Sequence, residues 1–366
     1  MSKKIKYEDI HNQLLPNDPP YVIAFYNQKG GVGKTTSVVN LADEVGKLGY
    51  KVLLIDYDPQ GSASYMSNMN IYDETIKSIG TVLYPYAFDG EMPTAKDVKE
   101  AIITPTYTVR KKKPKSTEWE DKVIPFHYDL LPTTGDALSV VELSISTKTA
   151  YLNKHPEHIR VLCKMVVNIV RDSMDYDFIF IDTNPTFGNM SVAAIFASDY
   201  LFMPTTADFL ATAGMKPMIS RICALREFAK NFDLLGACFT VYSKRRITDL
   251  EAMLDMNNLS SNVDDRLSLF EIMIPEDSAS VRNVVMEGHT ISCSSAVKKK
   301  LIARQYTYLA HELVIRFFER PDLLDYMESP LTLTKAVEEQ KEKERLAQEA
   351  KEKEEKEKAE KQEKEE

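Results

Sequence analysis

The chain has 366 residues, of which 43% are hydrophobic and 28% are charged, and its formal net charge is −9. This composition is typical of a globular protein with ample apolar core, in one large or two ordinary domains. The four cysteines have no paired or cluster-type spacing, which argues against a disulfide framework, a zinc site or an iron–sulfur cluster. We find no apolar run that approaches the roughly 18 residues of a membrane span and no signal-peptide core, so we expect a cytoplasmic protein.

The first predicted elements are a strand, a glycine-rich loop and a helix. A polar lead-in at residues 1–19 precedes the β-branched and aromatic run Tyr21–Tyr26, which predicts a buried strand. Apolar residues recur at helical spacing from Val38 to Leu48, and Gly49 supplies a helix stop. Between them, residues 29–35 read Lys-Gly-Gly-Val-Gly-Lys-Thr. Strand, glycine loop and helix are the context that a nucleotide-phosphate loop requires.

The chemistry of such a loop explains these residue types. Glycines let the backbone approach a polyphosphate, and the N–H groups and dipole at the start of a helix attract the anion. Lys34 would reach the β- and γ-phosphates, and the Thr35 hydroxyl would bind Mg²⁺. The predicted nucleotide-binding residues are Lys29, Gly30, Gly31, Val32, Gly33, Lys34, Thr35 and Thr36.

Acidic residues follow two further apolar runs, each of which predicts a buried strand. Residues 51–55 form an apolar run that ends in Asp56 and Asp58, whose alternate spacing points both carboxylates the same way. One could hold the Mg²⁺ shell while the other orients a water molecule. The run 177–181 ends in Asp182, in the position of the usual second Mg²⁺ partner of phosphate-loop enzymes. An ordinary turn and a helix cap remain alternatives for these aspartates. The predicted magnesium ligands are Thr35, Asp56, Asp58 and Asp182.

Two departures from the common phosphate loop point to one family. Gln28 stands where the first glycine is usual, and Lys29 follows it. This pattern resembles the deviant loop of the ParA/MinD family, and residues 56–61 resemble the Asp-x-Asp-Pro-Gln-Gly motif of its ParA subgroup. Further strand-like segments extend the resemblance over residues 20–318; they are 128–134, 200–206, 236–242 and 270–275. The resemblance implies a P-loop NTPase fold of the SIMIBI type, a mostly parallel twisted sheet flanked by helices.

The resemblance also implies roles for particular residues. Lys29 would cross the interface of an ATP-dependent homodimer and contact the nucleotide of the partner chain. Asp58 would position the attacking water, with Lys29 and Lys34 as the other catalytic residues, and Pro275 would lie near the adenine. The implied cofactors are ATP and Mg²⁺, and the implied activity is slow ATP hydrolysis.

ParA proteins bind double-stranded DNA without sequence preference and act with a ParB-like DNA-bound partner, so the resemblance implies plasmid or chromosome partition and nucleoid association. Candidate DNA contacts are Lys244, Arg245, Arg246, Arg282, Lys298, Lys299 and Lys300. The family typically has arginine after the Ile-Pro strand, whereas Glu276 and Asp277 follow Pro275 here. This departure predicts a rearranged or weakened DNA contact at this place.

We expect the ATPase domain to span residues 20–334, with two additions. Residues 85–127 are interpreted as an irregular insertion, whose basic run 110–115 is either a nucleic-acid contact or a solvated loop. Residues 335–366 carry 10 basic and 13 acidic residues and form either a solvated helix or a disordered tail. This tail lacks the amphipathic, membrane-seeking face of a MinD-type protein, so no membrane partner is expected.

Three other functions stay open. One is an ATP switch of the same superfamily that positions a protein cargo without binding DNA. Another is a small-molecule synthase of the family, and the last is a regulator that binds nucleotide without turnover.

Overall fold

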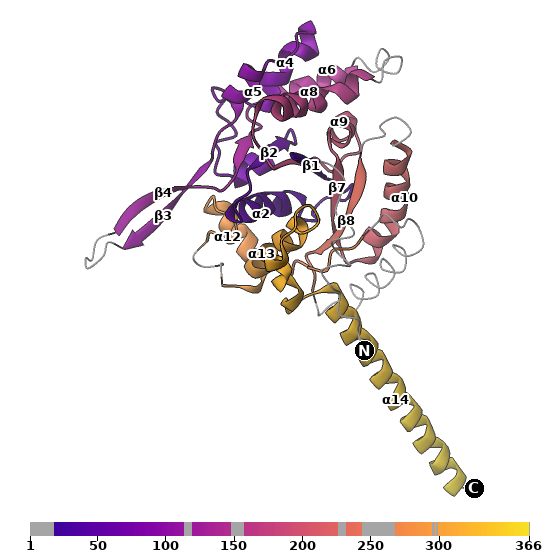
Figure 1. Cartoon of the computed structure of the whole chain (residues 1–366). Coiled ribbons are helices and arrows are strands. Elements are labelled where there is room, and N and C mark those ends of the chain that lie inside the picture. The colour runs from indigo at the N-terminus through magenta and orange to yellow at the C-terminus, as the bar shows by residue number, and fades with distance from the viewer. Residues whose placement is uncertain are drawn as a thin grey trace.

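The computed structural model describes residues 18–112, 119–147, 157–225, 232–243, 268–294, 297 and 299–365. Its centre is a six-stranded parallel sheet in the order β5-β2-β6-β1-β7-β8 (Figure 1). The strands are β1 (Tyr21–Phe25), β2 (Val52–Tyr57), β5 (Asp129–Leu131), β6 (Phe178–Thr183), β7 (Tyr200–Thr206) and β8 (Asp233–Thr240). The prediction of a mostly parallel sheet flanked by helices is confirmed.

Helices cover both faces of the sheet, which explains why its strands are largely apolar. Along β1, Val22 and Ala24 belong to one apolar cluster, whereas Ile23 and Phe25 belong to the other. The first cluster is closed by α4 (Ile79–Asp89), α5 (Ala95–Ala101), α6 (Ala137–Thr147), α8 (Glu157–Ser173), α9 (Asn189–Ala197) and α10 (Phe209–Leu225). The second is closed by α2 (Lys34–Lys47), α12 (Ser278–Met286), α13 (Leu301–Val314) and the 3₁₀ helix η1 (Pro321–Glu328).

The register of three central strands gathers the predicted site. β6 lies between β1 and β2, and it pairs Asp182 with Phe25 on one side and with Asp56 on the other. The phosphate loop leaves β1 directly after Phe25, and α3 (Ser62–Met66) follows the loop after β2. Because parallel strands end at the same edge of a sheet, the loop and the aspartates meet there.

Two expectations about local structure are wrong. The described part of 85–127 is not irregular, since it contains the end of α4, all of α5 and an antiparallel ribbon of β3 (Thr106–Lys112) and β4 (Trp119–Pro125). Alternating β-branched and aromatic residues near the base of the ribbon favour that pairing. Residues 270–275 form isolated bridges instead of a strand. The backbone N–H groups of Glu271 and Ile272 donate to the Glu312 carboxylate, at 2.8 and 2.9 Å, which removes them from a ladder.

The charged tail is helical in the structure. Helix α14 (Leu333–Glu365) begins in the core, where Leu333 and Ala336 are buried and Thr334 bonds to Glu271. It then projects away from the body (Figure 1), and its described side chains from Lys341 onward are exposed. In the described part of the chain, no helix is both long enough and apolar enough to cross a membrane.

The close approach of α2 to the segment before β5 predicts an unusual glycine effect. Alanine in place of a helical glycine normally stabilises by about 0.5–1 kcal/mol. A Cβ on Gly46 would lie 1.7 Å from the His127 carbonyl oxygen, and backbone cannot yield easily. We expect Gly46→Ala to lower the free energy of unfolding by about 1–3 kcal/mol in urea titrations. Gly214→Ala in α10, where the added Cβ meets nothing within 4 Å, should instead be neutral or stabilising. Equal effects of the two changes would contradict this packing.

Candidate nucleotide-binding site

The loop between β1 and α2 has the open backbone that an anion site needs. Gly31 and Gly33 both have φ +74°, in the left-handed region that favours glycine. A Cβ on Gly30 or Gly31 would meet nothing within 4 Å, so the space over the loop is open. Gly33 is the N-cap of α2 and has no side chain with which to cap it. The amide groups and dipole of the first turn of α2 are therefore suited to a phosphate.

Thr35 and Asp182 form a hydroxyl–carboxylate pair at the base of the loop. The Thr35 Oγ1 donates to Asp182 Oδ2 at 2.8 Å. The other carboxylate oxygen, Asp182 Oδ1, is buried and has no hydrogen-bond partner among the residues that the structure describes. A buried oxygen without a donor is costly, and a hydroxyl beside a carboxylate is the kind of oxygen pair that Mg²⁺ takes. These two residues therefore fit a magnesium ion.

Magnesium in nucleotide sites is usually held by one or two protein groups together with phosphate oxygens and water. Among the described residues, no group of three or more His, Cys, Asp and Glu side chains could hold a metal by itself. The arrangement is thus suited to a metal that arrives with a polyphosphate.

Three carboxylates and one ammonium group share the site. Burial raises the pKa of Asp56 to about 7 and raises those of Asp58 and Asp182, and for Asp182 the neighbouring Asp56 adds to the effect. Burial also lowers the pKa of Lys34, against the attraction of Asp182 and Asp58. With one lysine for three acids, the cluster is short of positive charge. A divalent cation would relieve this repulsion.

The aspartates after β2 are held in fixed orientations. Asp56 Oδ2 accepts from the Ser64 N–H at 2.7 Å and from the Ser64 hydroxyl at 2.6 Å. Asp58 Oδ1 accepts from the Gln60 N–H at 3.0 Å. Asp58 is also close enough to Lys34 for its pKa to be lowered by that charge, although burial outweighs this effect. Asp58 therefore lies near Lys34, in the place where the sequence predicts a water-orienting carboxylate.

The raised pKa of Asp56 predicts a pH dependence of stability. In the unfolded chain this carboxyl has a pKa near 3.8, and in the folded protein it rises to about 7. Between these values the folded state holds a proton that the unfolded state has lost, so its stabilising contribution is complete below about pH 4 and is lost as pH rises through 7. The ligand-free protein should lose unfolding free energy across this window, and Asp56→Asn should lose less. Parallel urea titrations from pH 4 to 8 would show it, and identical slopes would contradict it.

Lys29 lies in the loop but points to the end of β7. Its Nζ is 2.6 Å from Asp208 Oδ2 and 3.3 Å from Thr206 Oγ1. The backbone N–H of Lys29 donates to Asn27 Oδ1 at 2.9 Å. The Lys29 ammonium is thus retained within its own chain in this structure, next to the loop.

A cavity of about 370 Å³ adjoins the loop, where the sequence predicts the adenine region. Pro275 lines it together with Thr240 and Tyr306, and both Gly31 and Gly33 border it. Its surface is mainly apolar, which suits a nucleobase. The predicted DNA contact Arg282 is exposed and also lines this cavity.

Two of the other predicted DNA contacts, Lys299 and Lys300, lie in the described part of the chain. Lys299 is exposed, and Lys300 donates to Ser280 Oγ at 2.7 Å and lies 3.8 Å from Asp277. Asp277 therefore offsets the charge of Lys300. The remaining predicted contacts lie outside the described residues; they are Lys244, Arg245, Arg246 and Lys298.

The family model described as an AAA domain, AAA_31, matches residues 21–234, more than half of the chain. The chain belongs to this family, as a ParA-type member of the ParA/MinD superfamily. It is 24% identical over 306 residues to the chromosome partitioning protein ParA of Caulobacter vibrioides, covering 83% of this chain and 97% of that protein.

Two solved structures share the fold. An ATP complex of a McdA variant from Cyanothece has a TM-score of 0.60 at 16% identity, covering 83% of this chain and 99% of that one. Cobyrinic acid a,c-diamide synthase of Mycobacterium smegmatis, with bound ATP analogue and magnesium, has a TM-score of 0.55 at 22% identity, covering 80% and 94%. Because these proteins differ in kind, the shared fold does not choose among their functions.

Several residues of this ParA-type site escaped the sequence analysis. Asp208 holds Lys29, and Ser64 orients Asp56. The Thr240 hydroxyl donates to the Val32 carbonyl at 2.7 Å and so ties β8 to the loop. Asp208 follows the carboxyl end of β7, and the rule that ligands bind at strand ends could have singled it out. Thr240 lies in the segment 236–242 of the family resemblance, whereas Ser64 carries no comparable signal.

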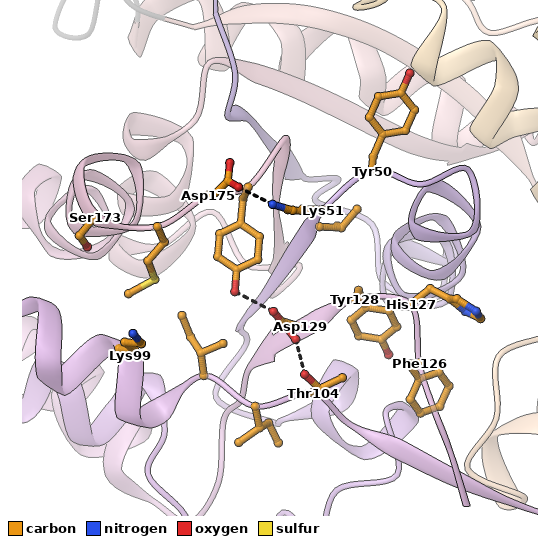
Figure 2. A pocket seen from close by; sticks show the side chains of 15 residues that line it. Tyr50, Lys51, Lys99, Thr104, Phe126, His127, Tyr128, Asp129, Ser173 and Asp175 are labelled. Carbon is orange, nitrogen blue, oxygen red and sulfur yellow. Dashed lines mark hydrogen bonds and ion pairs between the residues drawn. The ribbon is translucent and has the colours of Figure 1, made fainter.

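A larger cavity, of about 640 Å³, lies at the opposite edge of the sheet (Figure 2). Lys51 pairs there with Asp175 just before β2, and Asp129 at the start of β5 accepts from the Tyr176 hydroxyl at 2.9 Å and from Thr104. These are satisfied pairs at the amino ends of strands, far from the phosphate loop. The smaller cavity, in contrast, borders Gly31 and Gly33 of the phosphate loop.

Proposed function

We propose that this protein is an ATP-switched partition ATPase, which binds Mg–ATP, dimerises, associates with double-stranded DNA and then hydrolyses ATP slowly. The observation that carries the proposal is the phosphate loop with Thr35 bonded to Asp182, whose second oxygen is buried without a partner. The ParA-type family membership and the likeness to chromosome partitioning ParA support the partition role.

Hydrolysis would rely on positioning and charge neutralisation. The amides of the loop and Lys34 would bind the β- and γ-phosphates, and Thr35 with Asp182 would hold Mg²⁺ against them. Bound there, Mg²⁺ would offset negative charge on the phosphates. Asp58 would orient the attacking water, and Asp56 would act through the metal shell. All five residues stand at the carboxyl edge of β1, β2 and β6.

Dimerisation would require the Lys29 ammonium to break its contact with Asp208 of the same chain. Its ion pair with Asp208 is partly exposed, so the cost of breaking it is small. The released ammonium would reach the nucleotide of the partner chain, as the ParA/MinD resemblance implies. A nucleotide held between two chains would thus couple ATP binding to formation of the dimer.

DNA association and a ParB-like partner that stimulates turnover complete the proposal. The test is sedimentation of the protein with plasmid-length random DNA, in ATP, ADP or no nucleotide, at low and raised salt. We expect retention on DNA only with ATP, and release as salt rises. Dimers that form with ATP but ignore DNA would contradict the partition role and favour a switch that positions a protein cargo.

A further inference from the structure

The β3–β4 ribbon extends beyond the ATPase core. Its strands pair over seven positions, from Thr106 opposite Pro125 to Lys112 opposite Trp119, and span roughly 23 Å. Figure 1 shows the ribbon projecting from the edge of the molecule. Trp119 is 57% exposed and Val123 is 62% exposed, so β4 buries little apolar surface at these two positions. Large exposed side chains on a two-stranded ribbon, which is marginal by itself, indicate a surface that meets another molecule.

The base of the ribbon is fixed to the body. The Tyr107 and Phe126 rings pack with centroids 4.9 Å apart, and both side chains are buried. The Thr106 carbonyl accepts from Asn68 Nδ2 at 2.9 Å, and the Thr108 carbonyl accepts from His289 Nε2 at 3.2 Å. The ribbon therefore has a set direction relative to the core, and little orientation is lost when it binds.

The ribbon is positively charged on an acidic protein. Its 14 residues include four basic and two acidic ones, whereas the whole chain has a net charge of −9. Arg110 and Lys111 stand opposite Asp121 and Glu120, but Lys112 and Lys122 stand opposite Trp119 and Val109. Two basic positions of the described ribbon thus have no acidic residue directly opposite them in the backbone register. The local positive field on an acidic body selects a strongly anionic ligand.

We propose that the β3–β4 ribbon is a DNA-contacting arm of this protein; this inference rests on the DNA association proposed above. The major groove of DNA admits a two-stranded ribbon, and phosphate contacts need positive charge but no sequence readout. Trp119, with the Arg110 guanidinium 6.0 Å from its ring centroid, places an aromatic plane beside a cation. An ATP-dependent dimer carries two such arms, so it holds DNA more tightly than a monomer does through effective concentration.

The test compares DNA affinity against salt for the full chain in Mg–ATP. We expect the triple variant Arg110→Gln, Lys111→Gln, Lys112→Gln to bind at least ten-fold more weakly at low salt. The slope of log K against log salt should fall by about 1–3, since each phosphate contact contributes roughly 0.9. The opposite change, Glu120→Gln with Asp121→Asn, should tighten binding. Basal turnover and ATP-dependent dimerisation should stay as in the wild type.

The matched control is Lys341→Gln, Lys343→Gln, Arg345→Gln, which removes the same charge from exposed positions of α14. It should leave the slope unchanged. Trp119 is the only tryptophan of the chain, so its fluorescence in the unmodified protein should also change when DNA is added with ATP.

The outcomes separate this inference from the proposed function. If the wild type does not bind DNA in the presence of Mg–ATP, both the proposed function and the DNA-contacting arm are contradicted. If the wild type binds but the ribbon variants match it in affinity and slope, only the arm is overturned, and an acidic protein partner becomes the candidate for the ribbon. Equal weakening by the ribbon and α14 variants would likewise overturn the arm, since net charge alone would explain it.

Discussion

Replacing Asp182 by asparagine is expected to abolish Mg²⁺-dependent ATP hydrolysis while making the ligand-free protein more stable. The carboxylate is fully buried, one of its oxygens has no partner, and burial with the neighbouring Asp56 raises its pKa. Asparagine removes this unfavourable charge but keeps an oxygen that accepts from Thr35. The gain should be on the order of 1 kcal/mol, or about 2 °C in Tm. Turnover should fall at least ~10²-fold, because the proposed metal loses a ligand.

Asp175→Asn provides the matched control for this prediction. Asp175 precedes the same strand, but its side chain is 89% exposed. Its loss should change the free energy of unfolding by less than about 0.5 kcal/mol and leave turnover intact. Thermal melts with and without Mg–ATP, together with phosphate-release assays, measure both effects. An Asp182→Asn protein that melts lower than wild type, or that hydrolyses ATP normally, would contradict the proposed role of this carboxylate.

Replacing Lys29 by alanine is expected to prevent ATP-dependent dimerisation and to reduce turnover by about 10²–10³-fold, with ATP binding by the monomer largely kept. The Lys29 ammonium is held by a distant part of its own chain, through Asp208 and Thr206. Releasing it should therefore favour the dimer. Asp208→Asn weakens that hold, so it should lower the ATP concentration needed for dimerisation.

Lys51→Ala is the control, because Lys51 is also paired with an aspartate but lies at the other edge of the sheet. Its dimerisation curve should overlay that of the wild type. Light scattering against ATP concentration distinguishes the variants. Normal dimers from Lys29→Ala would show that the lysine has no bridging role, and an unchanged curve for Asp208→Asn would show that the intrachain pair does not compete.

The sequence predicted the core of the fold because its signals are local. The run at 21–26, the glycine loop and the periodic apolar residues after it each specify their own structure, and they form β1, the loop and α2. Asp56 and Asp182 could be assigned to one edge because strand ends in parallel sheets coincide. The family resemblance implied a mostly parallel sheet flanked by helices, but it gave no strand order.

The failures involve contacts between distant residues. The Glu312 carboxylate accepts hydrogen bonds from the backbone N–H groups of Glu271 and Ile272. No local pattern at residues 270–275 predicts these bonds, so the sequence favoured a strand there. The ribbon at 106–125 was obscured by its charged outer half, although its inner half alternates as a strand should. The Lys29–Asp208 pair joins residues 179 positions apart, which no local pattern encodes.

We expect ATP, and not ADP, to join two copies of this chain. Sedimentation velocity of Asp58→Ala in Mg–ATP and in Mg–ADP checks this, because losing the carboxylate proposed to orient the water should preserve the bound ATP. Dimers should form in Mg–ATP and monomers in Mg–ADP, with Lys29→Ala monomeric in both. The same mass with either nucleotide, whether monomer or dimer, would contradict it.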